Sequence, residues 1–266
     1  MDDAGPAAWA SASAYEAYVG RWSRLVAREC LKWLEAPAGG RWLDVGCGTG
    51  VLSEAILTSE SPQEVRGIDS SEPFVAYARS RVTDARARFE VANAMSLPFD
   101  AARFDAAASG LVLNFVPDAG VAVAEIARVL RPGGAFTAYV WDYGGEMQMM
   151  RRFWDAAVEL DPAAAKLDEG RIFGSSRNDW LKTLAQQAGF RDVSTRAIDI
   201  ETRFRDFDDY WTPFLGGVGP APAYVASLSE ERRAALRERI RATLTGGSNS
   251  LIDMIARAWA VRGVAG

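Results

Sequence analysis

Short apolar runs alternate with longer stretches of helical periodicity along the first half of the chain. A run of about four to eight mostly apolar residues predicts a buried strand, and apolar residues three or four positions apart predict one face of a helix. The predicted strands are 41–45, 64–68, 88–92, 104–109 and 135–141, and the predicted helices are 51–57, 73–82 and 118–130. Such alternation is typical of a parallel sheet with helices on both faces, whose ligands bind beyond the carboxyl ends of the strands.

The pattern differs on both sides of this region. Residues 15–34 have helical spacing and end at a Pro- and Gly-rich linker, 36–40. The later elements are predicted helices at 147–160 and 178–188, a strand at 192–200, an irregular aromatic-rich stretch at 204–224, a charged helix at 230–244 and a strand at 250–261. We therefore predict an α/β fold with a doubly wound, mostly parallel seven-stranded sheet, helices on both faces, and an aromatic-rich helical lid inserted late in the chain. The predicted parts are an N-terminal lid helix (1–40), an α/β core (41–142), a helical insertion (143–190), a core strand (191–204), a lid insertion with its helix (205–249) and a final core strand (250–266).

The composition of the chain indicates which class of partner it binds. The chain has 266 residues, of which 49% are hydrophobic and 24% are charged, enough for one large domain or one domain with a substantial insertion. Its net charge is −5 and its Lys and Arg residues are scattered, so we expect a small-molecule partner and no nucleic acid. The pattern leaves the oligomeric state open.

Targeting signals and metal-ligand spacings are both missing from the pattern. Asp2 and Asp3 stand where a secretory signal would be basic, and no apolar run reaches about 18 residues, so neither secretion nor membrane insertion is expected. Cys30 and Cys47 fall in different elements and form no metal-ligand spacing, so we expect no metal and a cytoplasmic location.

The most informative motif follows the first predicted strand. Leu43-Asp44-Val45-Gly46-Cys47-Gly48-Thr49-Gly50 places three glycines as G-x-G-x-G between a strand and a helix, where a ligand can lie against the backbone. Asp69 ends the next strand 19 positions after Gly50, where doubly wound folds place the carboxylate that binds a ribose diol. Dinucleotide-binding loops prefer G-x-G-x-x-G, so a nucleoside-containing ligand without phosphates fits this spacing better.

Four further segments accompany this loop in order. They are Asp69-Ser70-Ser71, Asn93-Ala94-Met95-Ser96-Leu97-Pro98-Phe99, Phe104-Asp105 and Arg128-Val129-Leu130-Arg131-Pro132-Gly133-Gly134. Together, over roughly residues 41 to 141, the chain resembles the class I S-adenosylmethionine-dependent methyltransferases, in particular a small bacterial branch similar to the quinone-biosynthesis C-methyltransferases. The resemblance implies S-adenosyl-L-methionine as the cofactor and a core, 41–142, that binds it.

The resemblance also implies which residues hold the cofactor. The backbone of the glycine loop would lie under its methionine part, Asp69 would take both ribose hydroxyls, and Asn93 stands beside adenine where the family usually has Asp. Asp44 either orders the loop or contacts the cofactor directly. The full predicted set is Tyr18, Arg21, Asp44, Gly46, Cys47, Gly48, Asp69, Ser70, Asn93, Ala94, Met95 and Leu111.

The chain contains no histidine, which removes the commonest general base near neutral pH. Asp142 is the best-placed proton acceptor, with Tyr143 beside it, and Asn114 stands where relatives often carry histidine and is expected to orient the substrate. The predicted acceptor pocket contains Trp22, Trp141, Trp211 and Phe214, although core packing is the ordinary explanation for any single ring. We therefore expect methyl transfer to a small apolar or aromatic acceptor, mainly by proximity and alignment.

Two other functions remain open on the sequence. A non-catalytic S-adenosylmethionine-binding regulatory protein would keep residues 41–100 and lack an open acceptor pocket. An NAD-dependent oxidoreductase would share the sheet and Asp69, but should have the longer glycine spacing and a Tyr-x-x-x-Lys pair. The acceptor, its reacting atom and the pathway are not specified by the pattern.

Overall fold

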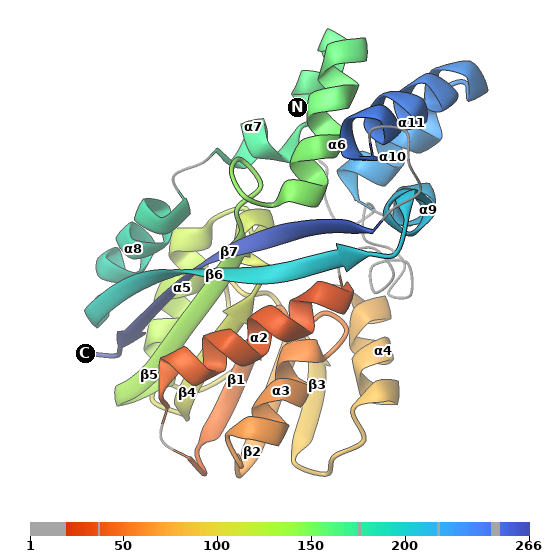
Figure 1. Ribbon diagram of the computed structural model, residues 1–266. Helices are drawn as coiled ribbons and strands as arrows, with labels where there is room; N and C mark the ends of the chain where they lie inside the picture. Colours follow the sequence, from red (N-terminus) through yellow and green to blue (C-terminus); the bar gives the residue numbers. More distant parts are fainter. Residues whose placement is uncertain (1–19, 37, 175–176, 217–218, 246–250) are drawn as a thin grey trace. The chain divides into compact units, whose positions relative to one another are not determined.

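The computed structural model describes residues 20–36, 38–174, 177–216, 219–245 and 251–266. Its sheet has seven strands in the order β3-β2-β1-β4-β5-β7-β6 (Figure 1). The strands are β1 (Arg41–Val45), β2 (Glu64–Asp69), β3 (Ala87–Val91), β4 (Phe104–Gly110), β5 (Leu130–Trp141), β6 (Arg191–Phe204) and β7 (Ile252–Val264). The pairs from β3 to β5 are parallel, which confirms the predicted doubly wound sheet.

The chain divides into two compact units. The core unit comprises Ser23–Val140, Ser176–Ile198 and Ala258–Gly266, and the insertion unit comprises Met1–Trp22, Trp141–Ser175 and Asp199–Arg257. The six-part division predicted from the sequence stays a prediction. Among the described residues, the structure has no helix long and apolar enough to cross a membrane.

Helices of the core unit cover both faces of the sheet (Figure 1). They are α2 (Arg21–Leu34, whose first two residues belong to the insertion unit), α3 (Val51–Ser59), α4 (Glu72–Arg81), α5 (Ala119–Val129) and α8 (Arg177–Gln187). Leu43 and Val45 of β1 share a buried cluster with residues of α5 and α8. Asp44 lies between them in sequence and bonds Ser53 of α3. Because side chains of a strand alternate between faces, α3 lies on the face opposite α5 and α8.

The interior of the core unit consists of well-packed aromatic and aliphatic side chains. Phe136 of β5 is fully buried and stacks on Phe190 with ring centroids 4.4 Å apart. Ile126 of α5 and Leu181 of α8 belong to the same cluster. Burial of this apolar surface is the main stabilising contribution to the sheet–helix sandwich.

Two segments differ between the prediction and the structure. Strand β5 begins at Leu130, directly after α5, so Arg131-Pro132-Gly133-Gly134 lies within the strand instead of separating it from the helix. The pairing of β4 with β5 is irregular between Phe104 and Ala106. The stretch predicted as irregular at 204–224 contains α9 (Phe207–Trp211), η5 (Thr212–Leu215) and α10 (Pro220–Ser227). Asp206 begins α9 by accepting from the backbone N–H of Asp209 at 2.8 Å, a helix cap that the aromatic pattern obscured.

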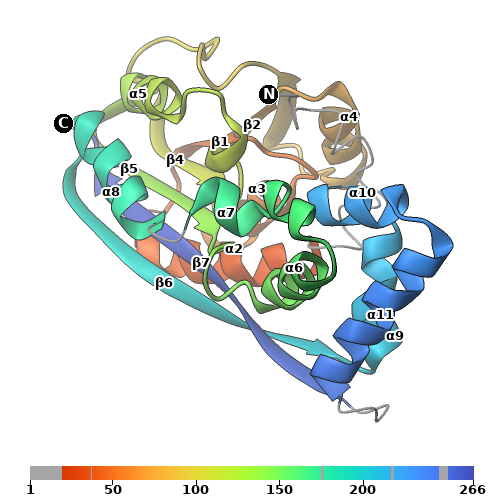
Figure 2. The same ribbon diagram turned by 90° about the horizontal axis from the view of Figure 1, so that it is seen from above.

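The insertion unit is mostly helical and has an aromatic core. Its other elements are α6 (Gln148–Leu160), η4 (Pro162–Lys166), α7 (Glu169–Phe173) and α11 (Glu230–Thr245) (Figure 2). Phe153 of α6 stacks on Phe214 of η5, with ring centroids 4.5 Å apart. Trp154 and Tyr224 lie against each other at 5.7 Å. These rings give the unit a hydrophobic core of its own.

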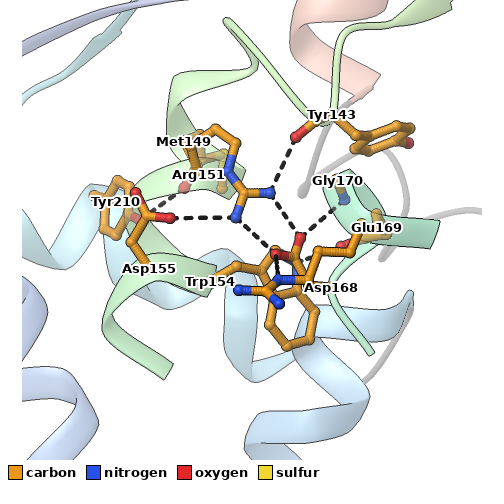
Figure 3. A network of polar contacts seen from close by, with 10 residues as sticks. Tyr143, Met149, Arg151, Trp154, Asp155, Asp168, Glu169, Gly170 and Tyr210 are labelled. Atoms are coloured by element: carbon orange, nitrogen blue, oxygen red, sulfur yellow. Dashed lines mark hydrogen bonds and ion pairs between the residues drawn. The ribbon is translucent and has the colours of Figure 1, made fainter. Parts of the chain in front are cut away.

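A polar network joins α6 to the segment before and within α7 (Figure 3). Arg151 donates to both carboxylate oxygens of Asp168, at 2.6 and 2.8 Å, and to the carbonyl oxygen of Tyr143 at 3.1 Å. The Trp154 indole N–H donates to the Glu169 carboxyl. Glu169 is almost fully buried, and burial raises its pKa to about 7, opposed by the hydrogen bond from Trp154.

The turn between β1 and α3 depends on glycine. Gly46, Gly48 and Gly50 have φ values of +76°, +49° and +83°, which other residues rarely adopt. A Cβ on Gly46 would lie 2.4 to 2.8 Å from side-chain atoms of Val112, whereas a Cβ on Gly48 would have no atom within 4 Å. The turn therefore packs tightly at Gly46 and faces open space at Gly48.

We expect Glu169→Gln to remove a pH-dependent loss of stability. The folded-state pKa lies above the ordinary value of 4.5, so the folded protein holds this proton between pH 4.5 and 7 whereas the unfolded chain releases it. Relative to the Gln variant, the native protein should thus lose about 3 kcal/mol of unfolding free energy between pH 4.5 and 8. Urea unfolding at several pH values measures the difference, and parallel pH profiles for the two proteins would contradict it.

We expect Gly46→Ala to destabilise the fold more than Gly133→Ala. Both glycines have φ near +77°, at +76° and +77°, so both substitutions incur about 1 kcal/mol of backbone strain. Gly133 has open space around its Cβ position, whereas Gly46 must displace Val112 at a further cost of about 1–3 kcal/mol. Thermal and urea unfolding compare the two variants. Equal losses of stability would contradict the tight approach at Gly46.

Candidate functional site

The turn after β1 contacts the end of β2 through hydrogen bonds within the core unit. The register pairs Val45 with Ile68, so the two strands end side by side. The Gly48 N–H donates to Asp69 Oδ2 at 3.0 Å, and the Ser71 N–H donates to Asp69 Oδ1 at 2.9 Å. The structure thus brings the predicted glycine loop and the predicted ribose-binding carboxylate together.

Asp69 is suited to accept further hydrogen bonds. Burial raises its pKa, and backbone N–H groups of Ser71 and Gly48 oppose that rise by stabilising the charged form. Oδ2 accepts from the Gly48 N–H and Oδ1 from the Ser71 N–H, and a carboxylate has about four lone-pair sites, so Asp69 can accept further donors. Two adjacent hydroxyl groups match two such acceptors. Ser70 lies next to Asp69 and is exposed.

Asp44 lies fully buried beneath the turn. Its Oδ2 accepts a hydrogen bond from the Ser53 hydroxyl at 2.7 Å, which ties β1 to α3. Its Oδ1 has no hydrogen-bond partner in the described part of the chain. Burial raises the pKa of Asp44 to about 7, and the Ser53 hydrogen bond opposes that rise. Asp44 therefore orders the turn between β1 and α3, and its direct contact with a ligand stays a prediction.

Cys47 contributes its backbone and a small buried side chain. It packs with Val75, Ala78 and Phe89, and burial raises the pKa of its thiol well above the ordinary value. A thiol held neutral in this way is a poor nucleophile. The Cys47 N–H donates to the Ile68 carbonyl at 2.8 Å, and the contact of the Cys47 backbone with the cofactor stays a prediction.

Residues after β3 form a second turn beside Asp69. The Ala92 N–H donates to the Asp69 carbonyl at 3.0 Å. Asn93 Oδ1 accepts from the Met95 N–H at 2.9 Å, and the Ser96 N–H donates to the Asn93 carbonyl. An amide oxygen has two lone pairs, so Asn93 can still accept from an exocyclic amine. The predicted adenine-binding residues Asn93, Ala94 and Met95 therefore lie in one tight turn next to Asp69.

Leu111 marks the exit of β4 with an unusual backbone conformation. Its φ is +63°, in the left-handed region that leucine rarely adopts, and its N–H donates to the Tyr139 carbonyl at 2.7 Å. The next residue, Val112, is the one that packs against Gly46. The contact of Leu111 with the cofactor stays a prediction.

Asn114 is held by an arginine that the sequence analysis did not single out. Arg177 of α8 donates to Asn114 Oδ1 at 3.0 Å, and its guanidinium lies 4.4 Å from the Trp180 ring centroid. The side-chain oxygen of Asn114 therefore already serves the fold, and its NH₂ group is the part left to orient a substrate. Because 63 positions separate the pair, no local spacing indicated it.

Asp142 and Tyr143 belong to the insertion unit. Asp142 is 4% exposed, and its Oδ2 accepts from the Glu146 N–H at 3.0 Å. Its Oδ1 has no partner among the described residues. Tyr143 is buried, and its ring centroid lies 5.5 Å from that of Phe173. Asp142 thus organises the 142–147 turn with one oxygen, and its catalytic role stays a prediction.

The remaining predicted residues also lie in the insertion unit. The Arg21 guanidinium lies 4.4 Å from the Trp22 ring centroid and 4.8 Å from that of Phe204, and its Nη1 is 3.4 Å from Asp209. Trp141 and Trp211 are buried, and Phe214 is fully buried against Phe153. Phe214 packs in the core of the insertion unit, and its assignment to the acceptor pocket stays a prediction. Tyr18 lies outside the described residues.

The core-unit residues fit a nucleoside ligand without phosphates. The open space at Gly48 leaves room against the loop backbone, and the remaining lone-pair sites of Asp69 suit a ribose diol. The loop also has the spacing G-x-G-x-G and not the G-x-G-x-x-G that pyrophosphate-binding loops prefer.

Comparisons with known proteins agree with this geometry. A family model described as a methyltransferase domain matches residues 43–138. The chain is 32% identical over 209 residues to 27-O-demethylrifamycin SV methyltransferase of Amycolatopsis mediterranei, covering 68% of this chain and 76% of that protein. It is 31% identical over 170 residues to demethylmenaquinone methyltransferase of Lactiplantibacillus plantarum, covering 57% and 70% of the two chains.

Solved structures share the fold. The YcgJ protein of Bacillus subtilis has a TM-score of 0.56 at 21% identity, covering 92% of this chain and 98% of that one. Phosphoethanolamine N-methyltransferase 2 of Haemonchus contortus, solved with S-adenosyl-L-methionine, has a TM-score of 0.58 at 19% identity, covering 95% of this chain and 56% of that one. The chain therefore belongs to the class I S-adenosylmethionine-dependent methyltransferases, and S-adenosyl-L-methionine is its cofactor.

Proposed function

We propose that this enzyme transfers the methyl group of S-adenosyl-L-methionine to a small aromatic acceptor that carries a hydroxyl group or an activated ring carbon. One relative is named for 27-O-demethylrifamycin SV and another for demethylmenaquinone, and these small-molecule acceptors support the proposal. The observation that carries the methyl-donor part of the proposal is the hydrogen bond between the glycine turn and Asp69, which supports a donor site at this turn.

The core unit supplies binding and orientation. Asp69 accepts from the ribose hydroxyls, the backbone of Gly46 to Gly48 lies along the amino-acid part, and the Asn93 turn lies beside adenine. When bound, the cofactor supplies a methyl group already activated by the positive charge of its sulfonium. The chain then needs chiefly to hold the acceptor atom about 3 to 3.5 Å from that methyl carbon and to exclude water.

Few groups of the chain can remove a proton from the acceptor. The chain has no histidine, so a carboxylate, a tyrosine or water must take any proton. Asp142 is the carboxylate we assign, because its Oδ1 is buried and has no partner among the described residues. A phenol or hydroquinone, already acidic, needs little assistance from such a base. Tyr143, Trp22, Trp141 and Trp211 are proposed to border the acceptor.

Incubation with methyl-labelled donor and a panel of acceptors tests the proposal. The panel contains hydroquinones, naphthols, simple amines and thiols, and label transfer to the hydroxylated aromatic members is the expected result. Transfer only to amines or thiols would contradict the proposed acceptor class. Saturable donor binding without transfer to any member of a wide panel would favour a regulatory role instead.

We expect Asp69→Asn to raise the KM for the donor by roughly tenfold to a hundredfold, with kcat changed much less. The substitution keeps the shape of the side chain but removes charged acceptors, each worth about 1.5–3 kcal/mol in hydrogen bonds. Asp100→Asn, at an exposed position of the same unit, is the matched control and should leave the KM unchanged. Initial rates at varied donor concentration measure both. An unchanged donor KM in Asp69→Asn would rule out the ribose assignment.

A further inference from the structure

Arg177 and Asn114 bring a cation and an amide together beyond the carboxyl end of β4. Arg177 Nη1 donates to Asn114 Oδ1 at 3.0 Å, and both side chains are half-buried. A guanidinium has five N–H donors and no acceptor, so only the amide oxygen of Asn114 can face it. The Asn114 NH₂ group makes no hydrogen bond with the described residues. The pair therefore offers a ligand hydrogen-bond donors together with a positive charge.

A short series of contacts links this pair to the glycine turn. The Val112 side chain occupies the space that a Cβ on Gly46 would need. The Phe115 N–H donates to the Val112 carbonyl at 2.8 Å, which closes a tight turn that contains Asn114. Ligands of doubly wound sheets bind at this edge, beyond the carboxyl ends of the strands. An acceptor held by Asn114 would therefore lie next to the proposed donor site.

The position of Arg177 on its helix also favours a bound anion. Arg177 is the first residue of α8, where the helix macrodipole disfavours a cation and favours an anion. Its guanidinium lies 4.4 Å from the ring centroid of Trp180, which packs against the buried cluster of the core unit and holds the planar fork in place. The acidic residue of the first turn, Asp179, is exposed and accepts from Asn178.

We infer that Arg177 and the Asn114 NH₂ group bind the acidic oxygen of the aromatic acceptor as an oxyanion, so that Arg177 determines which acceptors the enzyme takes. This inference rests on the proposed acceptor class. When a phenol binds, its O–H bond breaks, the electron pair stays on the oxygen and the proton leaves to water. The phenolate accepts from both side chains, whereas an amine would place its own N–H donors against theirs. Phe115, 40% exposed in the same turn, offers an apolar surface to the ring.

Such a site also suits a chain that contains no histidine. An acceptor that is already an anion when methyl transfer begins needs no general base at that oxygen. Hydrogen bonds to an anion are about twice as strong as those to a neutral oxygen. Binding to the pair therefore favours the phenolate over the phenol.

Absorbance titration with 4-nitrophenol tests the inference on the full chain loaded with S-adenosylhomocysteine. This phenol ionises near neutral pH and only its phenolate is yellow, so the ionised fraction is measured directly. We expect the native protein to favour bound phenolate over bound phenol about tenfold more than water does. 4-Nitroaniline has the same shape but carries N–H donors, and it should bind about tenfold more weakly.

Two variants separate this role from structural support. Arg177→Gln keeps an N–H donor for Asn114 but removes the charge, whereas Asn114→Asp keeps the link to Arg177 but replaces the NH₂ donor with a carboxylate. Both should lose the preference for phenolate and raise the KM for a hydroxylated aromatic acceptor roughly tenfold, with the affinity for S-adenosylhomocysteine unchanged. Arg88→Gln and Gln187→Glu make the same changes of charge at exposed positions of the core unit and should behave like the native protein.

The outcomes distinguish this inference from the proposed function. A native protein that does not bind S-adenosylhomocysteine contradicts the donor site. A loaded native protein that leaves the phenolate fraction unchanged, or that binds 4-nitroaniline equally well, overturns the role of the pair, even where label transfer to hydroxylated aromatics supports the acceptor class. A native phenolate preference in Arg177→Gln overturns the role of Arg177. If that variant does not fold, Asn114→Asp decides in its place, because it retains the contact between the two side chains.

Discussion

The hydrogen bond between the Gly48 N–H and the Asp69 carboxylate is the interaction on which the donor site depends. It exists because β1 and β2 are parallel and in register, so that the turn after one strand meets the last residue of the other. It also requires a backbone that turns with positive φ at Gly46 and Gly48. Sheet topology and glycine thus combine to place the Asp69 carboxylate, which we propose as the ribose acceptor, beside an open stretch of backbone.

Two buried or half-buried carboxyls give this site its chemical character. Asp69 is held by backbone N–H groups and keeps lone pairs for hydroxyls, whereas Asp44 is sealed beneath the turn with one oxygen bonded to Ser53. Such an arrangement suits a ligand with a ribose diol, whose two hydroxyl groups can donate to one carboxylate.

Patterns in the sequence predicted the core unit well and the insertion unit less well. The strands and helices from β1 to α5 follow from simple periodicity, and the motif around Gly46 with Asp69 indicated the donor site, because both depend on residues near one another in sequence or at strand ends. The short helices between 207 and 227 were missed, since none of them exceeds eight residues and a helical period does not stand out over so short a stretch. The Arg177–Asn114 contact and the orphan Oδ1 of Asp142 depend on tertiary packing, which no local pattern encodes. An aromatic residue in a lid segment can pack in the core or border a ligand, and the sequence alone does not distinguish these two roles for Phe214, which stacks on Phe153.

Calorimetric titration of the native protein with S-adenosylhomocysteine, in parallel with NAD, tests the central claim most directly. The account predicts saturable binding of one S-adenosylhomocysteine per chain and no heat of binding with NAD. Saturable NAD binding without any S-adenosylhomocysteine binding would contradict it, because the turn at Gly46 and the carboxylate of Asp69 would then serve a pyrophosphate-bearing coenzyme.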